Sequence, residues 1–216
     1  MGEDGDGTRS FGSEDRRNIQ RLVRTGKMRV GVLCIGHVDS GKAKRIQEGI
    51  STILTQTKCD LIDEQIPLPE EALDEARKQH RSDIILRKVR SYAEKSSFDR
   101  VLGVADVDIF VQRLNFVFGQ ADCGGRAALI SLWRLRPEYY GDLPNEQLFD
   151  ERSVKEAVHE LGHTLGLEHC SNVFCVMHFS NSIYETDVKH SLFCSRCSAK
   201  AEAAITEIGK TYGGQV

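Results

Sequence analysis

Three histidines and one glutamate have the types and spacing of a zinc site that can activate water. The segment from His159 to His169 is a complete H-E-x-x-H-x-x-G-x-x-H. Histidines four residues apart lie about 40° from one another around a helix, so His159 and His163 can bind one ion. Glu160 lies about 100° from His159 and can stand beside the metal without binding it. Gly166 can end the helix in a left-handed conformation and return His169 as the third ligand.

These residues predict hydrolysis of a carbonyl compound by zinc-activated water. Three neutral imidazoles leave one zinc position open for water. The metal would lower the pKa of that water and polarise a bound carbonyl, while Glu160 would take the proton and pass it to a leaving amine. The competing interpretation is a structural zinc, or histidines that are simply exposed. A structural site normally closes its fourth position with a protein ligand, so the motif favours catalysis.

The zinc motif is predicted to lie on a helix over about residues 153–167. Ser153 and Glu156 fit a capping box, which places the start of the helix at Ser153. An apolar stripe then follows at helical spacing: Val154, Ala157, Val158, Leu161 and Leu165. This stripe would bury one side of the helix in the core.

Four of the seven cysteines have the spacing of a second metal site. They form a C-x4-C pair and a C-x2-C pair: Cys170, Cys175, Cys194 and Cys197. Thiolates in two close pairs suit a tetrahedral structural zinc. Two disulfides are the alternative, but we recognise no secretory signal and therefore expect a reducing compartment. The other three cysteines are expected to be ordinary core residues: Cys34, Cys59 and Cys123.

Together these motifs resemble the archaemetzincins, a family within the metzincin class of zinc metalloproteases. The resemblance rests on the long zinc motif with Cys170 directly after it, on the turn Cys175-Val176-Met177, and on the final Cys194-Ser195-Arg196-Cys197. It continues upstream through residues 114–121 and 132–137.

The resemblance covers about residues 28–210 and implies a metzincin-like zincin fold. It implies two zinc ions per chain, a catalytic one on the three histidines and a structural one on the four cysteines in the region 170–197. Met177 would lie in the Met-turn. Some metzincins add a tyrosine ligand two residues after this methionine; here that residue is Phe179, so no such ligand is available. The implied activity is that of a zinc-dependent peptidase, with peptides or proteins as substrates.

We expect an α/β (α+β) domain built on a twisted mixed sheet of five strands. Apolar and β-branched runs predict strands at residues 28–35, 60–67, 100–107, 115–118 and 127–132. Besides the zinc helix, helical spacing occurs at residues 42–57, within 68–95 and at about 198–208. The resemblance implies that one edge strand is antiparallel, and residues 114–121 are the candidate. Such an edge can pair with an extended peptide substrate.

The composition is that of an ordinary globular chain. The 216 residues have a net charge of −3 and a pI of about 6.2, with 40% hydrophobic and 28% charged residues. This gives no reason to expect nucleic acid or an anionic membrane as a partner, and no apolar run approaches the roughly 20 residues that span a bilayer. Residues 1–27 are expected to be a charged, flexible extension of a single domain at residues 28–216. We expect a cytoplasmic monomer.

The sequence leaves two other functions open. Residues 36–43 nearly match the phosphate-binding P-loop, G-x-x-x-x-G-K-[ST], but Ala43 replaces the hydroxyl that would bind Mg²⁺. A tight turn with Asp39 or Ser40 capping a helix is the simpler interpretation. The other alternative is a non-enzymatic zinc-binding module that recognises peptides. Glu160 favours catalysis over this module, because three histidines alone would suffice to hold a metal.

Overall fold

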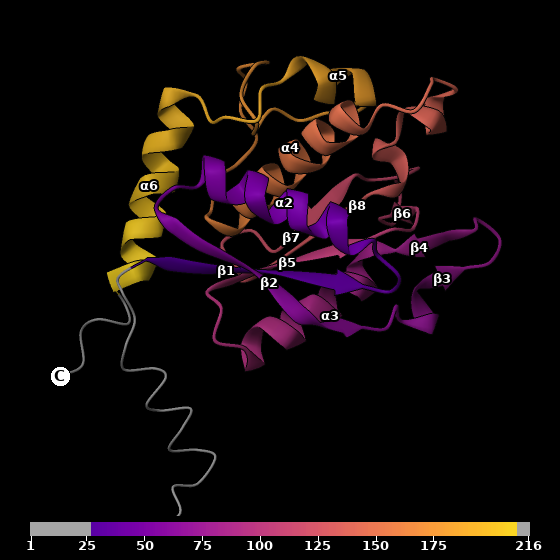
Figure 1. The fold of residues 1–216 in the computed structure, drawn as a ribbon, viewed down its shortest axis with the longest axis horizontal. Helices are drawn as coiled ribbons and strands as arrows, with labels where there is room; N and C mark the ends of the chain where they lie inside the picture. The colour runs from indigo at the N-terminus through magenta and orange to yellow at the C-terminus, as the bar shows by residue number, and fades with distance from the viewer. Residues whose placement is uncertain (1–26, 211–216) are drawn as a thin grey trace, which may run out of the picture.

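A five-stranded mixed sheet forms the centre of the protein (Figure 1). The computed structural model describes residues 27–210, so nearly all of the predicted extension at residues 1–27 lies outside the described residues. The strands are β1 (Met28–Ile35), β2 (Thr57–Ile66), β5 (Arg100–Ala105), β7 (Gly119–Ala121) and β8 (Ala127–Ser131). Their order is β2-β1-β5-β8-β7. All neighbours are parallel except β7, which is antiparallel to β8 at the edge, so the predicted sheet is confirmed.

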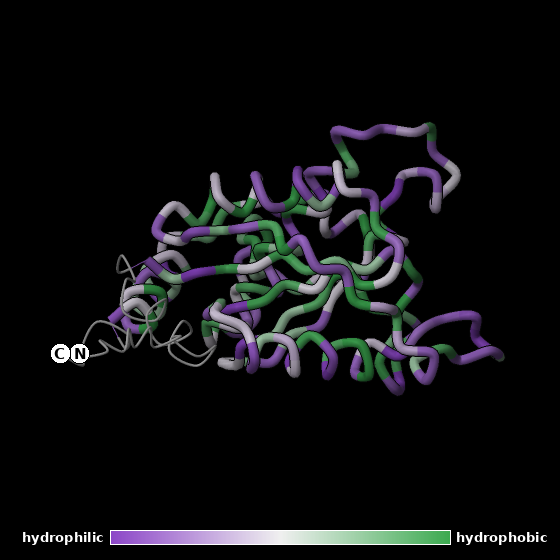
Figure 2. The backbone as a smooth tube through the Cα atoms, turned by 60° about the horizontal axis from the view of Figure 1, so that its bottom comes forward, coloured by the Kyte–Doolittle hydropathy of each residue, from purple (hydrophilic) through white to green (hydrophobic). Residues whose placement is uncertain are grey.

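Helices cover both faces of this sheet (Figure 1). The three that do so are α2 (Ser40–Ile53), α3 (Ser82–Lys95) and α4 (Glu146–Thr164). Side chains alternate along β1, where Val30 and Val32 join the core shared with α2 and α4, whereas Leu33 and Ile35 join the core shared with α3. Figure 2 shows the apolar strands inside and more hydrophilic segments around them. Because the central strands are buried on both faces, their sequences are continuously apolar.

Helix α2 begins in the segment that nearly matches a P-loop. Asp39 is its N-cap, and Asp39 Oδ1 accepts a hydrogen bond of 2.9 Å from the backbone N–H of Lys42. The Lys42 ammonium lies 4.5 Å from the centre of the Phe149 ring instead of in the turn. A carboxylate therefore takes a helix N-terminal N–H group that a phosphate would need. The geometry supports the capped turn over a nucleotide site.

A second, three-stranded sheet was not predicted. It contains β3 (Leu73–Asp74), β4 (Gln79–Arg81) and β6 (Ile109–Phe110), and it follows the short helix η1 (Glu70–Ala72). Strands of two or three residues are too short to show an alternating pattern in the sequence.

The prediction of a strand at residues 115–118 was wrong, because this segment forms bends and irregular coil before β7 begins at Gly119. Arg77 Nη2 donates hydrogen bonds to the carbonyls of Leu114 (3.0 Å) and Asn115 (2.7 Å). Gln79 Nε2 also donates to the Asn115 carbonyl, at 3.0 Å. Arg77 and Gln79 thus bind the carbonyls at the start of the candidate edge strand, whereas the Phe118 carbonyl accepts a hydrogen bond of 2.8 Å from Ser131 N in β8. Only the last part of the candidate edge strand is a strand.

The prediction of a capping box at the start of the zinc helix was also wrong. Asn145 caps α4, and its Oδ1 accepts a hydrogen bond from Leu148 N at 3.0 Å. Ser153 lies inside the helix, where its hydroxyl donates to the Phe149 carbonyl at 2.8 Å. Serine tolerates this position because its hydroxyl bonds back to the preceding turn.

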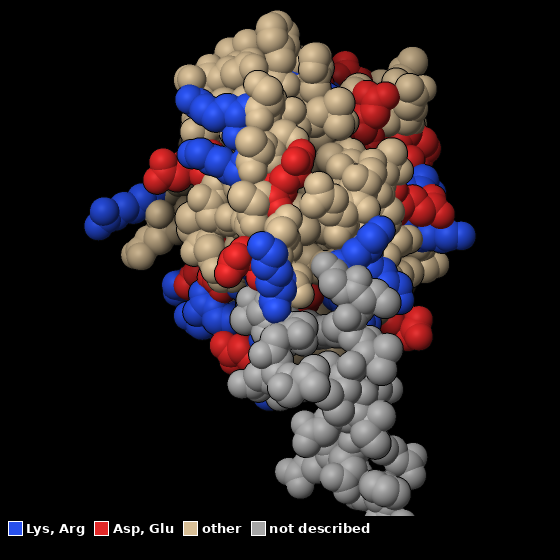
Figure 3. All heavy atoms as spheres, turned by 90° about the vertical axis from the view of Figure 1, so that its left-hand side faces the viewer, with Lys and Arg blue, Asp and Glu red and all other residues tan. Residues whose placement is uncertain are grey.

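The remaining elements follow the main sheet and close the domain. They are η2 (Trp133–Leu135), η3 (Pro137–Tyr140), α5 (Ile183–Val188) and α6 (Ser195–Lys210). Helix α6 confirms the helix predicted at about residues 198–208 and lies across the end of the sheet (Figure 1). On this side of the molecule, basic and acidic side chains are interspersed (Figure 3). Among residues 27–210, none of the helices has the length and apolar character needed to span a bilayer.

Candidate active site

The end of α4 brings three imidazoles together. His159 and His163 lie on the helix, and Gly166 follows with φ 81°, the left-handed conformation that the sequence prediction required. A hydrogen bond from Leu167 N to the Gly162 carbonyl at 3.1 Å closes the turn. The chain then returns His169 to the same place, so that one ligand nitrogen from each histidine lies within 4.8 Å of the others.

The spacing of these nitrogens fits a zinc ion. The Nε2 atoms of His159 and His163 are 3.1 Å apart. Tetrahedral zinc with Zn–N bonds of about 2.0–2.1 Å places two ligand nitrogens roughly 3.3 Å apart. His159 Nδ1 lies 2.7 Å from the Val176 carbonyl, and His163 Nδ1 lies 2.7 Å from the Leu167 carbonyl. Since a carbonyl only accepts, each Nδ1 carries the proton and each Nε2 presents its lone pair.

The surroundings of the three imidazoles favour the neutral form that binds metal, although His169 is exposed. Desolvation lowers the pKa of His159 well below its usual value, and it also lowers the pKa of His163 and His169. The positive charge of Lys189 acts in the same direction on all three. These groups therefore need not lose a proton before an ion binds near neutral pH.

Glu160 lies beside the histidines and is almost completely buried. Burial raises the pKa of its carboxyl well above the usual value, and the nearby Glu156 raises it further, whereas Lys189 opposes the shift. The carboxyl packs closely against β7: a Cβ built on Gly119 would lie 2.6 Å from Glu160 Oε1. The edge strand and the helix thus hold this carboxyl from both sides.

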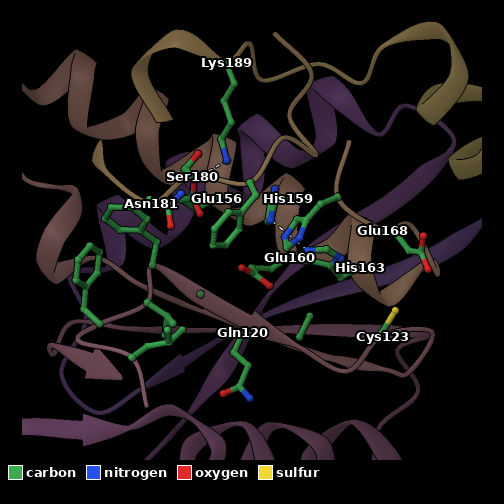
Figure 4. A pocket seen from close by; sticks show the side chains of 18 of the residues that line it. Gln120, Cys123, Glu156, His159, Glu160, His163, Glu168, Ser180, Asn181 and Lys189 are labelled. Atoms are coloured by element: carbon green, nitrogen blue, oxygen red, sulfur yellow. Dashed lines mark hydrogen bonds and ion pairs between the residues drawn. The ribbon is translucent and has the colours of Figure 1, made fainter. Parts of the chain in front are cut away.

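A cavity of about 590 Å³ opens onto these residues (Figure 4). Three parts of the chain form its walls: the edge segment 114–121, helix α4, and the segment after Met177 with Lys189. Phe179 lies against His169, with ring centres 4.8 Å apart. The cavity is thus bounded by the sheet edge on one side and by the zinc helix and the following loop on the other (Figure 4).

The four cysteines predicted as a second metal site lie together. Cys170 Sγ and Cys194 Sγ are 3.8 Å apart, and all four sulfurs lie within 4.8 Å of one another. Tetrahedral zinc with Zn–S bonds of about 2.3 Å requires sulfur separations of roughly 3.8 Å, whereas a disulfide requires about 2.05 Å. All seven cysteines are free. The donor set and its spacing therefore fit zinc better than two disulfides.

One thiol of this cluster is favoured as a thiolate. Burial alone would raise the pKa of Cys170, but hydrogen bonds from the Asn172 backbone and the Arg196 guanidinium, with the neighbouring cysteines, lower it to about 6. Arg196 Nη2 lies 3.4 Å from Cys170 Sγ. A thiolate is the form that binds a metal, so this environment supports the interpretation of the cluster as a zinc site.

Of the three cysteines expected in the core, only Cys59 is fully buried. Cys34 is half-buried in β1. Cys123 is exposed at the rim of the cavity, so its prediction as a core residue was wrong. Cys123 lies in the turn between β7 and β8 and not in a buried strand.

Four buried charged residues on and against α4 were not predicted from the sequence: Arg152, Lys155, Glu156 and Lys189. Arg152 binds both carboxylate oxygens of Asp187 at 2.7 Å, and Lys189 Nζ lies 2.9 Å from Glu156 Oε1. Arg152, Glu156 and His159 are four and three residues apart, which places them on one face of the helix. That spacing was a usable signal for the helix residues, but nothing in the sequence points to Lys189 as their partner.

Comparison with known proteins places the chain in a family. Residues 44–203 match the model of peptidase family M54. The archaemetzincin of Methanocaldococcus jannaschii is 41% identical over 175 residues, covering 81% of this chain and 93% of that protein. The crystal structure of archaemetzincin from Methanopyrus kandleri superposes with a TM-score of 0.74 at 36% identity, over 85% of this chain and 98% of that one. A zinc-dependent peptidase from Methanocorpusculum labreanum gives a TM-score of 0.72 at 27% identity, over 80% and 99% of the two chains. The chain therefore belongs to peptidase family M54, the archaemetzincins, and is a zinc metallopeptidase of the metzincin type.

Proposed function

We propose that this enzyme hydrolyses peptide bonds of peptides or small proteins, with His159, His163 and His169 holding a catalytic zinc and Glu160 acting as general base. The observation that carries the proposal is the convergence of three neutral imidazoles beside one buried carboxyl in a cavity. A structural site would need a fourth protein ligand. Among the described residues, the metal-ligating group at this site consists of these three histidines alone.

The zinc ion and Glu160 have different roles in the proposed reaction. A zinc ion on the histidines supplies a Lewis acid that activates water and polarises a carbonyl group. Glu160 takes a proton from the attacking water and then gives it to the leaving amine. Its raised pKa suits this double role, since the carboxyl must both gain and lose a proton during one turnover. The close contact with Gly119 and the helix keeps the carboxyl in one position between these two transfers.

The sheet edge can align the substrate. β7 is the edge strand of the main sheet, next to β8, and its residues Gly119, Gln120 and Ala121 all line the cavity. An extended peptide can add to such an edge through backbone hydrogen bonds. A proline at Val117, just before this strand, should weaken peptide binding without removing zinc.

The second metal completes the proposal. Cys170, Cys175, Cys194 and Cys197 hold a structural zinc, which gives two ions per chain. The support for this is the cluster of four sulfurs at separations that suit tetrahedral zinc. The cluster joins the turn after His169 to the start of α6, with Met177 in the enclosed loop.

Metal analysis and a peptide cleavage assay on three proteins test the proposal. The wild type should contain two zinc ions and cleave members of a peptide library. Glu160→Gln should keep both ions and lose at least about 100-fold in turnover, because it removes the proton acceptor and little else. His163→Ala should contain one ion. Cleavage by Glu160→Gln at the wild-type rate would exclude the role of Glu160, and two ions in His163→Ala would exclude the histidine site.

A further inference from the structure

A buried lysine lies in the wall of the cavity without an assigned role. The side chain of Lys189 is 1% exposed, and its Nζ lies 2.9 Å from Glu156 Oε1, whose side chain is 4% exposed. Figure 4 shows Lys189 extending toward Glu156 on one side of the histidines, with Ser180 and Asn181 beside them. Burying an ammonium is costly even when it is paired, so its position calls for an explanation.

Two hydrogen-bond donors at this end of the cavity have no hydrogen-bond partner among the described residues. They are Lys189 Nζ and Ser180 Oγ, and both atoms are buried. The contact of Lys189 with Glu156 is close, but it is not aligned as a hydrogen bond. An ammonium has three N–H groups, so at least two remain available even if this contact tightens. Buried donors nearly always have a hydrogen-bond partner in native proteins. Two buried donors without a partner, on residues that line one cavity, therefore point to a ligand.

Two neighbouring cations, Lys155 and Arg152, connect α4 to α5, so this connection does not require Lys189. Lys155 Nζ donates to the carbonyls of Thr186 and Asp187, at 3.1 Å each. Arg152 binds the Asp187 carboxylate through two hydrogen bonds. Both side chains thus donate hydrogen bonds within the protein and already join α4 to α5. Lys189 differs from both because its side chain lines the cavity that also contains His159 and Glu160.

We propose that Lys189 and Ser180 form an anion-recognising end of the substrate cavity, and that the enzyme prefers peptides that place a carboxylate there. This inference rests on the proposed peptidase function. A carboxylate offers two acceptor oxygens, one for the ammonium and one for the hydroxyl. Glu156 balances the charge of Lys189 when no substrate is bound. A basic side chain of a substrate would be repelled by the Lys189 ammonium, so the site would bind acidic peptides and also exclude basic ones.

The carboxylate can come from an acidic side chain near the cleaved bond or from the C-terminus of a short peptide. Peptide hydroxamates, which bind zinc without being cleaved, provide probes for both sources. One matched pair carries Glu or Gln at the same position with an amidated C-terminus. A second pair carries a neutral side chain with a free or an amidated C-terminus. Calorimetry on the zinc-loaded wild type should show one acidic probe binding about 10- to 100-fold more tightly than its neutral partner. The pair that shows the difference identifies the source.

Lys189→Met should abolish this preference, and Ser180→Ala should reduce it. Lys155→Met is the matched control, because it removes another buried ammonium on the same interface that does not line this cavity; it should keep the preference. Zinc content is measured for every variant. If Lys189→Met fails to fold, the double variant Glu156→Gln/Lys189→Met, which leaves no unpaired charge, takes its place.

Two results would overturn the inference: equal binding of acidic and neutral probes in both pairs by the wild type, or an unchanged preference after Lys189 is neutralised. The readout separates this inference from the proposed function. Absence of peptide cleavage by a protein that still prefers acidic hydroxamates would reject peptidase activity and retain the anion site. Peptide cleavage without any preference for acidic probes would retain peptidase activity and reject the anion site.

Discussion

Gly162 lies directly against the sulfur of Met177. A Cβ built on Gly162 would be 2.4 Å from Met177 Sδ and 3.1 Å from its Cε. Gly162 stands between His159 and His163 on the zinc helix, and Met177 is completely buried. Glycine weakens a helix interior by roughly 1 kcal/mol relative to alanine. The close approach of the methionine explains why the helix carries a glycine at this point.

Gly162→Ala should therefore destabilise the protein although alanine favours helices. The added methyl group must displace Met177, and overpacking of this kind costs about 1–3 kcal/mol. Because Gly162 precedes His163, the displacement should also weaken zinc binding at the histidines. Thermal unfolding and chelator competition would measure both effects.

A double-mutant cycle separates this contact from a general effect on the helix. Met177→Ala removes the side chain that the new methyl group meets. In the Met177→Ala background, Gly162→Ala should cost less than it does in the wild type, by about 0.5–3 kcal/mol of coupling. Additive effects, or a Gly162→Ala protein with wild-type melting temperature and zinc affinity, would show that the contact has no energetic importance.

Gly119→Ala should impair turnover while leaving zinc content unchanged. The new Cβ would lie 2.6 Å from Glu160 Oε1 and 2.7 Å from the Leu129 carbonyl, so Glu160 or the edge strand must move. If Glu160 is the general base, as we propose, a shift of a fraction of an ångström disturbs the geometry of proton transfer, and we expect a decrease of at least about 10-fold in kcat. Peptide cleavage and elemental analysis are the measurements.

Gly141→Ala is a control for the general effect of replacing a glycine. Gly141 has φ 86°, so alanine is strained there, but its Cβ would meet no atom within 4 Å. This variant should lose about 1–2 kcal/mol of stability and retain its kcat. If Gly119→Ala and Gly141→Ala show the same kcat, the packing of Gly119 against Glu160 does not matter for turnover.

The sequence predicted those features that repeat or that depend on fixed spacing. The long runs at β1, β5 and β8 are apolar because both faces are buried, so their strands could be identified. The three histidines and the turn at Gly166 follow from helix geometry alone. Their convergence required no knowledge of the rest of the fold.

The remaining features depend on contacts between distant segments. Ser153 and Glu156 had the spacing of a cap, but the turn before them is helical too, and Glu156 instead pairs with Lys189 from beyond α5. Residues 115–118 looked like a strand, but Arg77 binds the carbonyls at the start of this segment. Local propensity was correct in neither case, because the deciding partner lies far away in the chain.

The stability of the protein should fall at high pH through Cys59. Burial raises the pKa of this thiol from 9.0 to about 12, and the charge of Asp60 adds to the shift. Above pH 9 the unfolded chain releases this proton and the folded one does not, so stability is lost as the pH rises from 9 towards 12. Linkage gives a loss of about 1.4 kcal/mol by pH 10.

Urea unfolding at pH 7 and pH 10 would measure this effect, with Cys59→Ala as the comparison. The variant has lower stability at both values because it leaves a small cavity, but its loss between them should be smaller by about 1.4 kcal/mol. Other groups that titrate in this range, including Tyr140 with its pKa raised to about 12 by burial, contribute equally to both proteins. An identical loss in the two would exclude Cys59 as a contributor.

Removing one cysteine of the four should affect both metal sites. Cys197→Ser should release one zinc ion, because Cys197 is one of the four clustered sulfurs. Loss of a structural zinc should lower the melting temperature by roughly 10 °C or more. Cys170 directly follows His169, and its backbone N–H donates to the Met177 carbonyl at 2.9 Å, so loosening the cluster should also weaken zinc binding by the histidines.

Cys123→Ser is the matched control for this prediction, since Cys123 is exposed and lies outside the cluster. It should retain two zinc ions and the wild-type melting temperature. Chelator competition would then compare the affinity of the histidine site in the two variants. Weakened affinity in Cys197→Ser alone would establish that the cysteine cluster supports the active site as well as the fold. Two members of the cluster adjoin the histidines: Cys170 follows His169, and Cys175 precedes Val176, whose carbonyl lies 2.7 Å from His159 Nδ1. Unchanged affinity after loss of the other ion would mean that α4 and the turn at Gly166 hold the three histidines without help from the cluster.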